Sequence, residues 1–294
     1  MPVAEILKPR ARDLGGGFTV RRLLPAFPTR AVGPFVFFDH FGPILTRPDD
    51  NHDVRPHPHI GLATVTFLFE GAMLHRDSLG NVQRIEPGAI NWMTAGNGIV
   101  HSERRPPDLH EATYTAHGLQ LWVALPLSAE ESAPAFRHTP ADAIPAWSKP
   151  GLQGRVLVGD AFDRRSPVET FAGTLYLDLV AEPGAALDLP SRFAGSDYER
   201  AVYSVDHPLQ VDGTDVPPFA MAVLERGAPA TIVAPRGARY VVVGGEPLDG
   251  PRFIWWNFVS SSKERIERAK ADWTQQRMGQ IPGETEWIPL PQDR

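Results

Sequence analysis

Short runs of strand-forming residues, repeatedly interrupted by glycine and proline, constrain the fold of this chain more than any other feature. Its 294 residues include 30 prolines and 26 glycines, which end regular structure and reverse the chain. The runs between them are rich in β-branched and aromatic residues, as strands are. We predict strands at residues 18–24, 34–41, 63–71, 83–93, 118–126, 155–161, 173–182, 200–213, 219–225, 230–235 and 238–247. This pattern indicates an all-β sandwich or barrel.

The strands form two groups, and the chain is long enough to bury two cores. Between the groups, residues 131–150 are dense in alanine, proline and serine and show no steady apolar period. Such composition is typical of a connection between domains. We therefore predict an N-terminal domain at residues 1–130, a linker at 131–150 and a C-terminal domain at 151–294.

One helix is predicted near the C-terminus, at about residues 262–277. Ser261 and Glu264 have the spacing of a capping box, and Gly279 supplies a stop. Apolar residues recur inside this stretch at spacings of three and four, which is the period of a helix face. They are Ile266, Ala269 and Trp273. We expect this stripe to pack on the C-terminal domain.

The composition excludes several classes of function. The chain has no cysteine, so disulfides, thiolate metal sites and cysteine nucleophiles are excluded. Its net charge of -6 and the lack of a basic run argue against direct nucleic-acid binding. No apolar run approaches the ~18 residues of a membrane span, and the charged N-terminal residues are unlike a signal peptide. We therefore expect no membrane contact and a cytoplasmic location.

Two closely spaced pairs of potential metal ligands are the main chemical feature. His57 and His59 are two residues apart, as are His101 and Glu103. Residues two apart in a strand point to the same face. If the two strands are neighbours, three imidazoles and one carboxylate converge and leave coordination positions open for substrate or dioxygen. Surface histidine pairs are common, so spacing alone leaves a metal-free interpretation open.

The remaining histidines lack such a partner. His40 could support the site from outside the ligand set, but a structural role is the simpler interpretation. We expect the following to be loop or surface residues: His52, His75, His110, His117 and His138. Only His207 lies beyond residue 150, so the second half should hold no site made of several imidazoles.

The motifs resemble the pirin family, a branch of the cupin superfamily. The matching segments of the first half are PHPH at 56–59, WMTAG at 92–96, and His101 with Glu103. In the second half, residues 199–213, 221–227 and 244–269 also follow the family pattern. The resemblance implies a bicupin: two cupin-type β-barrel or sandwich domains with a C-terminal helix. It also implies that only the N-terminal domain binds metal, through His57, His59, His101 and Glu103.

Ligand type does not fix the metal, because iron(II), nickel, copper, manganese, cobalt and zinc all accept such ligands. The resemblance implies iron(II), and an activity like that of a quercetin 2,3-dioxygenase, an oxidoreductase that opens a flavonol ring with dioxygen. In that case Glu103 serves as ligand and as general base. Five aromatic residues could line a pocket for a small aromatic substrate, or could be plain core. They are Phe35, Phe37, Phe38, Phe67 and Trp92.

The resemblance also implies an alternative without catalysis. Some pirins act as regulators that contact a protein partner, and there the iron centre acts as a redox sensor. Both hypotheses use the same four side chains. Turnover of a flavonol distinguishes them, and a third possibility, a metal-free structural cupin, predicts no stoichiometric metal.

Overall fold

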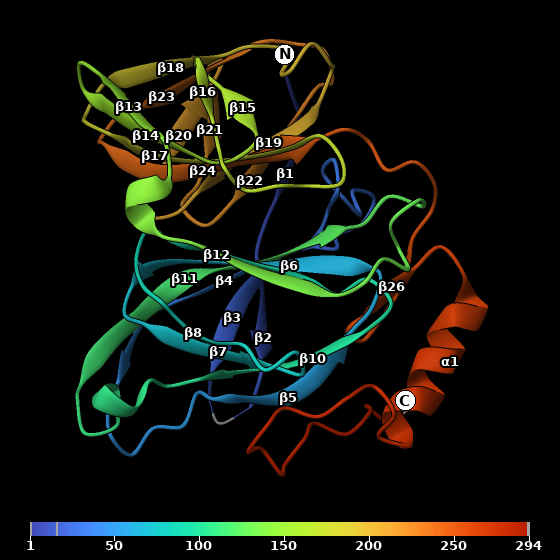
Figure 1. The fold of residues 1–294 in the computed structure, drawn as a ribbon. Helices are drawn as coiled ribbons and strands as arrows, with labels where there is room; N and C mark the ends of the chain where they lie inside the picture. The colour runs from blue at the N-terminus through green and yellow to red at the C-terminus, as the bar shows by residue number, and fades with distance from the viewer. Residues whose placement is uncertain (1, 16, 293–294) are drawn as a thin grey trace. The chain divides into compact units, whose positions relative to one another are not determined.

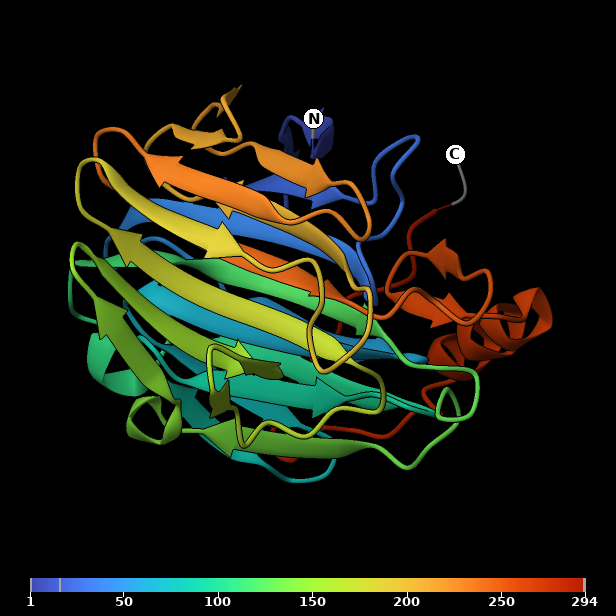
Figure 2. The ribbon, with the colours of Figure 1, turned by 90° about the horizontal axis from the view of Figure 1, so that it is seen from above.

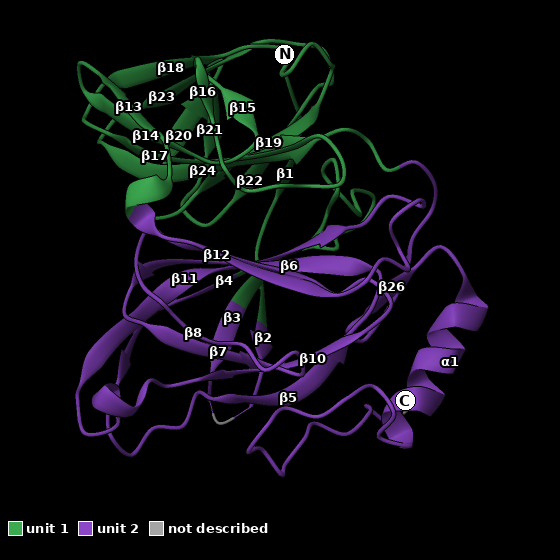
Figure 3. Cartoon of the chain, in the orientation of Figure 1, with its two compact units in different colours: residues 1–11, 21–39, 142–248 green, residues 12–20, 40–141, 249–294 purple. Residues whose placement is uncertain are grey.

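The computed structural model of this protein describes residues 2–15 and 17–292. The chain is mostly β-strand and divides into two compact units, coloured separately in Figure 3. Unit 1 comprises Met1–Ala11, Arg21–Asp39 and Asp142–Leu248, and unit 2 comprises Arg12–Val20, His40–Ala141 and Asp249–Arg294. These units differ from the predicted boundaries, because the N-terminal segment contributes to both and the C-terminal segment joins unit 2.

Two sheets and a hairpin carry the strands of unit 2 (Figure 1). The seven-stranded sheet has the order β12 (Ala135–Thr139), β9 (Ile90–Thr94), β6 (Leu62–Glu70), β11 (Tyr114–Ala124), β4 (Phe35–Thr46), β3 (Thr19–Leu24) and β2 (Arg10–Asp13). The chain passes between the units within the last three of these strands. The four-stranded sheet has the order β5 (Val54–His59), β10 (Ile99–Arg104), β7 (Met73–Asp77) and β8 (Val82–Ile85). The hairpin is β25 (Phe253–Trp255) and β26 (Phe258–Ser260).

Unit 1 repeats this plan of a large and a small sheet. The seven-stranded sheet has the order β1 (Val3–Leu7), β22 (Met221–Leu224), β19 (Glu199–Ser204), β24 (Ala238–Gly245), β17 (Thr174–Ala181), β14 (Leu152–Val158) and β13 (Ala146–Lys149). The small sheet has the order β18 (Ala185–Leu189), β23 (Ala230–Ala234), β20 (Leu209–Val211) and β21 (Thr214–Val216). A ribbon of β15 (Asp160–Ala161) and β16 (Arg164–Arg165) completes the unit. Alternate residues of these strands, such as Leu175, Leu177 and Leu179, enter one apolar core.

The all-β prediction is therefore confirmed, with differences of detail. The predicted strand at 83–93 is two strands, because Pro87 and Gly88 turn the chain between β8 and β9. The predicted strand at 200–213 is likewise divided into β19 and β20. The predicted linker contains β12, β13 and a short 3-10 helix at Ala141–Ala143, and another 3-10 helix lies at Pro107–Leu109.

The predicted helix is found as α1 (Lys263–Thr274), but its cap and its partner differ from the prediction. Ser262, rather than Ser261, is the N-cap and accepts a hydrogen bond from the Arg265 backbone N–H. The helix ends before Gly279. Its stripe packs with Ile60, Val100 and Phe258 of unit 2, and Figures 1 and 2 both show α1 beside the β25–β26 hairpin. The expected packing on the C-terminal domain is therefore wrong.

Replacing Trp273 by alanine should destabilise the protein by about 3–5 kcal/mol. The indole is 2% exposed in this cluster, and its Nε1–H donates to the Ile288 carbonyl at 2.9 Å. Removal of a buried aromatic leaves a cavity that the surrounding core cannot fully close. Urea unfolding measures the loss. Trp287→Ala is the matched control, since Trp287 is 47% exposed, and equal losses in both variants would contradict the assigned packing.

No helix among the described residues combines the length and the apolar character that a membrane crossing requires.

Candidate metal centre

The two predicted ligand pairs lie on neighbouring antiparallel strands of unit 2. His57 and His59 are on β5, and His101 and Glu103 are on β10. The register places His101 opposite His57, and Ile99 opposite His59. The three imidazoles are on one face, because each strand alternates its side chains. All three are buried, with 6% or less of each residue exposed.

The three imidazoles converge closely enough to share one cation. One nitrogen from each ring lies within 4.8 Å of the other two. The Nε2 atoms of His59 and His101 are 3.1 Å apart. Nitrogen atoms bound to one tetrahedral or octahedral metal at about 2.1 Å lie about 3–3.5 Å apart. Among the described residues this is the one group of three or more His, Cys, Asp or Glu side chains with such spacing.

Hydrogen bonds orient two of the three rings. Nδ1 of His57 lies 2.8 Å from the Arg55 carbonyl, and Nδ1 of His59 lies 3.1 Å from the Asn257 carbonyl. A carbonyl accepts from a protonated Nδ1, so Nε2 is the nitrogen left with a lone pair for a metal. Nδ1 of His101 is buried and has no hydrogen-bond partner among the described residues. Its ring is held by packing, 4.3 Å from the His57 ring.

Electrostatics keep the imidazoles neutral. Burial lowers the pKa of His57 to about 4. Burial and the neighbouring His57 lower the pKa of His59 and of His101 well below the ordinary value. Only a neutral imidazole offers a lone pair to a metal. Burial therefore already holds the three histidines in the protonation state that binds an ion. The donor set, its orientation and its protonation state all fit a bound divalent ion.

The metal-free protein should lose stability as the pH falls below about 6.5. The unfolded chain protonates its histidines near that pH, whereas His57 stays neutral in the folded protein down to about pH 4. The unfolded state therefore binds more protons between these values, and the unfolding free energy decreases by up to about 1.4 kcal/mol per pH unit for each such histidine. Urea unfolding at pH 7 and pH 5 measures this. A free energy unchanged between the two would contradict the neutral cluster.

Glu103 lies on β10, two residues after His101, but it is not part of the group whose ligand atoms converge. A bulge shifts the register so that Glu103 pairs with Val54, three residues before His57. Its carboxylate accepts a hydrogen bond from Gln120 Nε2 at 3.0 Å. The Thr66 hydroxyl donates to Oε1 of Gln120 and so fixes the orientation of that amide. Burial raises the pKa of Glu103 to about 7 in the absence of a cation.

A fourth histidine near the cluster was missed by the sequence prediction. His75 is on β7 and is buried, not at the surface, and its ring lies 5.4 Å from that of His101. Its Nε2 is 2.9 Å from Oδ2 of the buried Asp77, and Phe136 stacks on the ring at 4.1 Å. The His-x-Asp spacing on one strand face could have indicated it. His117 was also wrongly expected at the surface, since it is buried with its Nε2 2.8 Å from that of His40.

Glu103 lies on the wall of a narrow cavity in unit 2. The cavity is lined by aromatic and charged side chains from several strands and loops, including Phe18, Phe41, Tyr114 and Arg105. Its volume is about 40 Å³, room for one or two water molecules. A larger guest therefore requires these side chains to move. Of the two interpretations of the predicted aromatic residues, the structure supports plain core packing, because all five are buried and none of them lines this cavity.

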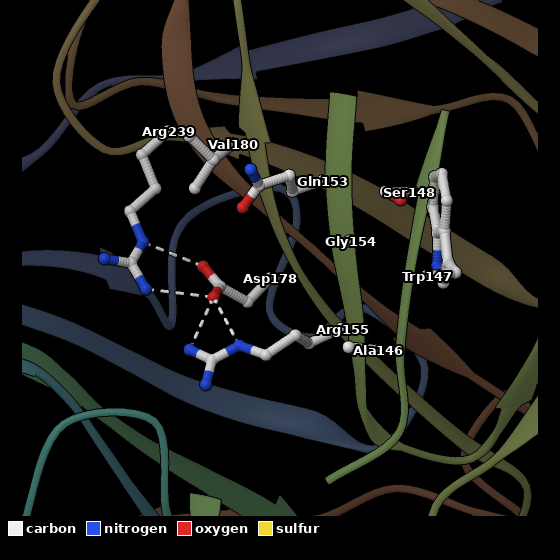
Figure 4. A pocket seen from close by; sticks show the side chains of 9 residues that line it. All are labelled: Ala146, Trp147, Ser148, Gln153, Gly154, Arg155, Asp178, Val180 and Arg239. Atoms are coloured by element: carbon white, nitrogen blue, oxygen red, sulfur yellow. Dashed lines mark hydrogen bonds and ion pairs between the residues drawn. The ribbon is translucent and has the colours of Figure 1, made fainter. Parts of the chain in front are cut away.

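A cavity in unit 1 has a different chemistry (Figure 4). It measures about 500 Å³ and lies over β13, β14, β17 and β24. Asp178 accepts hydrogen bonds from both Arg155 and Arg239, as the dashed lines in Figure 4 show. No histidine lines it, and a carboxylate already shared by two guanidinium groups is a poor metal ligand. The candidate chemistry therefore belongs to unit 2.

Two family models match the chain. The pirin model covers residues 17–123, and the model of the pirin C-terminal cupin domain covers residues 176–279. The chain belongs to the pirin family. The resemblance seen in the PHPH and WMTAG segments is thereby confirmed, and with it the fold of two cupin domains.

Individual pirins and a related enzyme structure support this assignment. A pirin-like protein of Caulobacter vibrioides is 45% identical over 288 residues, covering 96% of this chain and 97% of that protein. Human pirin is 33% identical over 277 residues, covering 92% of this chain and 91% of its own. A crystal structure of quercetin 2,3-dioxygenase from Acinetobacter baumannii is 34% identical, with a TM-score of 0.91 and coverage of 99% of this chain and 95% of that one.

Proposed function

We propose that this pirin is a metal-dependent dioxygenase that cleaves a flavonol or a similar small aromatic substrate with dioxygen. The convergence of three buried, neutral imidazoles is the observation that carries this proposal. The similarity to a quercetin 2,3-dioxygenase over almost the whole chain supports the choice of reaction. Cysteine ligands are excluded, and three nitrogen donors leave coordination positions for substrate and dioxygen.

The proposed ligands are His57, His59, His101 and Glu103, and the proposed metal is iron(II). Three imidazoles and a carboxylate also accept nickel, copper, manganese, cobalt and zinc, so the proposal of iron rests on the resemblance to pirins and not on the ligands. A bound divalent ion supplies a positive charge that acidifies the substrate hydroxyl and a centre at which dioxygen becomes reactive.

Glu103 is proposed to take the proton from the flavonol hydroxyl. Its side chain lines the cavity, which a substrate can enter once the lining side chains move, while the imidazoles are almost fully buried. Gln120 donates to one carboxylate oxygen and thereby orients the group. Because its carboxylate lies outside the group of converging nitrogen atoms, we propose that it alternates between ligand and base. Movement of cavity residues such as Phe18 is needed to admit the flat substrate.

Anaerobic loading with iron(II), followed by quercetin in air, tests the proposal. We expect loss of the flavonol absorbance with many turnovers per bound iron, and no loss in the metal-free protein. Nickel- and cobalt-loaded samples identify which metal supports turnover. Stoichiometric iron without turnover would contradict the enzyme and is the result that the regulatory alternative predicts.

A further inference from the structure

The last part of the chain covers the outer face of the strands that carry the candidate ligands. Residues 281–288, here called the C-terminal strap, belong to unit 2, and Figure 1 shows the red C-terminal coil near β5. Side chains of β10 alternate, so Ser102 and Arg104 face away from the cluster while His101 and Glu103 face it. The outward residues are the ones that the strap contacts.

Glu284 is the anchor of the strap on β10. Its Oε1 accepts a hydrogen bond from Ser102 Oγ at 2.5 Å, and its Oε2 accepts one from Arg104 Nη2. Arg76 Nε of β7 lies 3.8 Å from the same carboxylate. The side chain of Glu284 is only 6% exposed. Burial disfavours the charged form, but the hydrogen bonds from Arg104 and Ser102 outweigh it and lower the pKa of Glu284.

Backbone hydrogen bonds tie the strap to the other strands. The Ile288 N–H donates to the carbonyl of Pro56 at 2.8 Å, directly beside His57 on β5. The Pro282 carbonyl accepts from Arg76 of β7 at 2.8 Å. Ile281 packs in the apolar cluster with Val100 of β10. One short segment therefore fixes the outer side of three neighbouring strands, two of which carry the candidate ligands.

We propose that Glu284 is a positioning residue of the metal centre, which holds β10 so that His101 and Glu103 face His57 and His59 in binding geometry. This role depends on the proposed metal centre, and it adds a residue that does not itself bind the metal. Nδ1 of His101 has no acceptor of its own, so the orientation of this ring depends on its strand and its packing. Charge-assisted hydrogen bonds from two β10 side chains to one buried carboxylate fix that strand more firmly than neutral bonds would.

Cobalt(II) binding to the full-length protein tests this role. We expect Glu284→Gln to weaken cobalt affinity by about 10–100-fold, the range found when outer-shell partners of metal ligands are replaced. The visible absorption bands of bound cobalt should also shift, because they report ligand geometry. Competition with a chelator measures the affinity, and circular dichroism verifies that each variant is folded.

Glu286→Gln is the matched control. Glu286 also accepts a hydrogen bond from Arg104, at 2.6 Å, but its side chain is 49% exposed. We expect its cobalt affinity to change by no more than about fivefold, as for a surface ion pair, with unchanged bands. Equal effects of the two substitutions would overturn the assignment to Glu284.

Ser102→Ala provides a second test that needs no change of charge. It removes one of the two β10 hydrogen bonds to Glu284, so we expect a smaller loss of affinity in the same direction. Wild-type affinity and spectrum in both Glu284→Gln and Ser102→Ala would overturn the proposal. His101→Ala separates this result from failure of the metal centre itself. If His101→Ala still binds cobalt, the ligand assignment is wrong. If His101→Ala loses cobalt binding while Glu284→Gln binds cobalt as the wild type does, only the role of the strap is disproved.

Discussion

Replacing His59 or His101 by alanine should abolish stoichiometric metal binding. Each substitution removes one of three converging imidazoles from a buried site, and the remaining two cannot enclose an ion from the same directions. Replacement of outer-shell partners already costs about 10–100-fold in affinity, so loss of a direct ligand should exceed about 100-fold. Elemental analysis after purification and titration with iron(II) under anaerobic conditions measure the effect. Flavonol turnover should disappear with the metal.

The matched control for these variants is His110→Ala. His110 is exposed, follows a short 3-10 helix and is absent from the cluster, so its metal content should equal that of the wild type. His75 is unsuitable as this control, because its buried ring lies 5.4 Å from that of His101. Normal metal content in His59→Ala and His101→Ala would show that the cluster is a packed structural group. An equal loss of metal in His110→Ala would mean that such substitutions damage the protein as a whole and not the metal site.

The part of this site that sequence could predict follows from the period of a strand. Residues 57 and 59 share a face wherever the chain is extended, as do residues 101 and 103, and the structure places both pairs on neighbouring strands. The strand positions were likewise predictable from β-branched and aromatic runs between turns. These features depend on residues close together in the chain, so local patterns contain them.

The features that sequence did not reveal depend on contacts between distant segments. The stripe of α1 was predicted correctly, but an apolar stripe does not specify its partner, and Ile60 and Val100 fill that role. Near its N-terminus the chain passes back and forth between the two units. Domain boundaries predicted from changes in composition therefore could not match the boundaries of the units. His75 and Asp77 have the spacing of residues on one strand face, but the position of His75 beside His101 becomes visible only when β7 pairs with β10.

Glu103→Gln should retain metal and lose activity, which distinguishes a base from a mere ligand. Glutamine keeps the size of the side chain and an oxygen that can bind a metal, but it cannot take a proton. Gln120 donates to Glu103 at present and can donate to the new carbonyl oxygen, so the local structure should persist. Loss of a general base costs about 10²–10⁴-fold in turnover. We expect kcat for quercetin to fall in this range, measured on protein whose iron content has been matched to that of the wild type.

Two other outcomes of the Glu103→Gln experiment would each assign a different role to the carboxylate. If Glu103→Gln loses the metal together with the activity, the carboxylate is required as a fourth ligand and its role as base is unproven. If it keeps both, the proton of the substrate goes to another group, and the carboxylate on the cavity wall only shapes the entrance. The three histidines would remain the metal site in either case, because their convergence does not involve Glu103. Glutamine at this position therefore separates the binding of the ion from the chemistry that the ion supports.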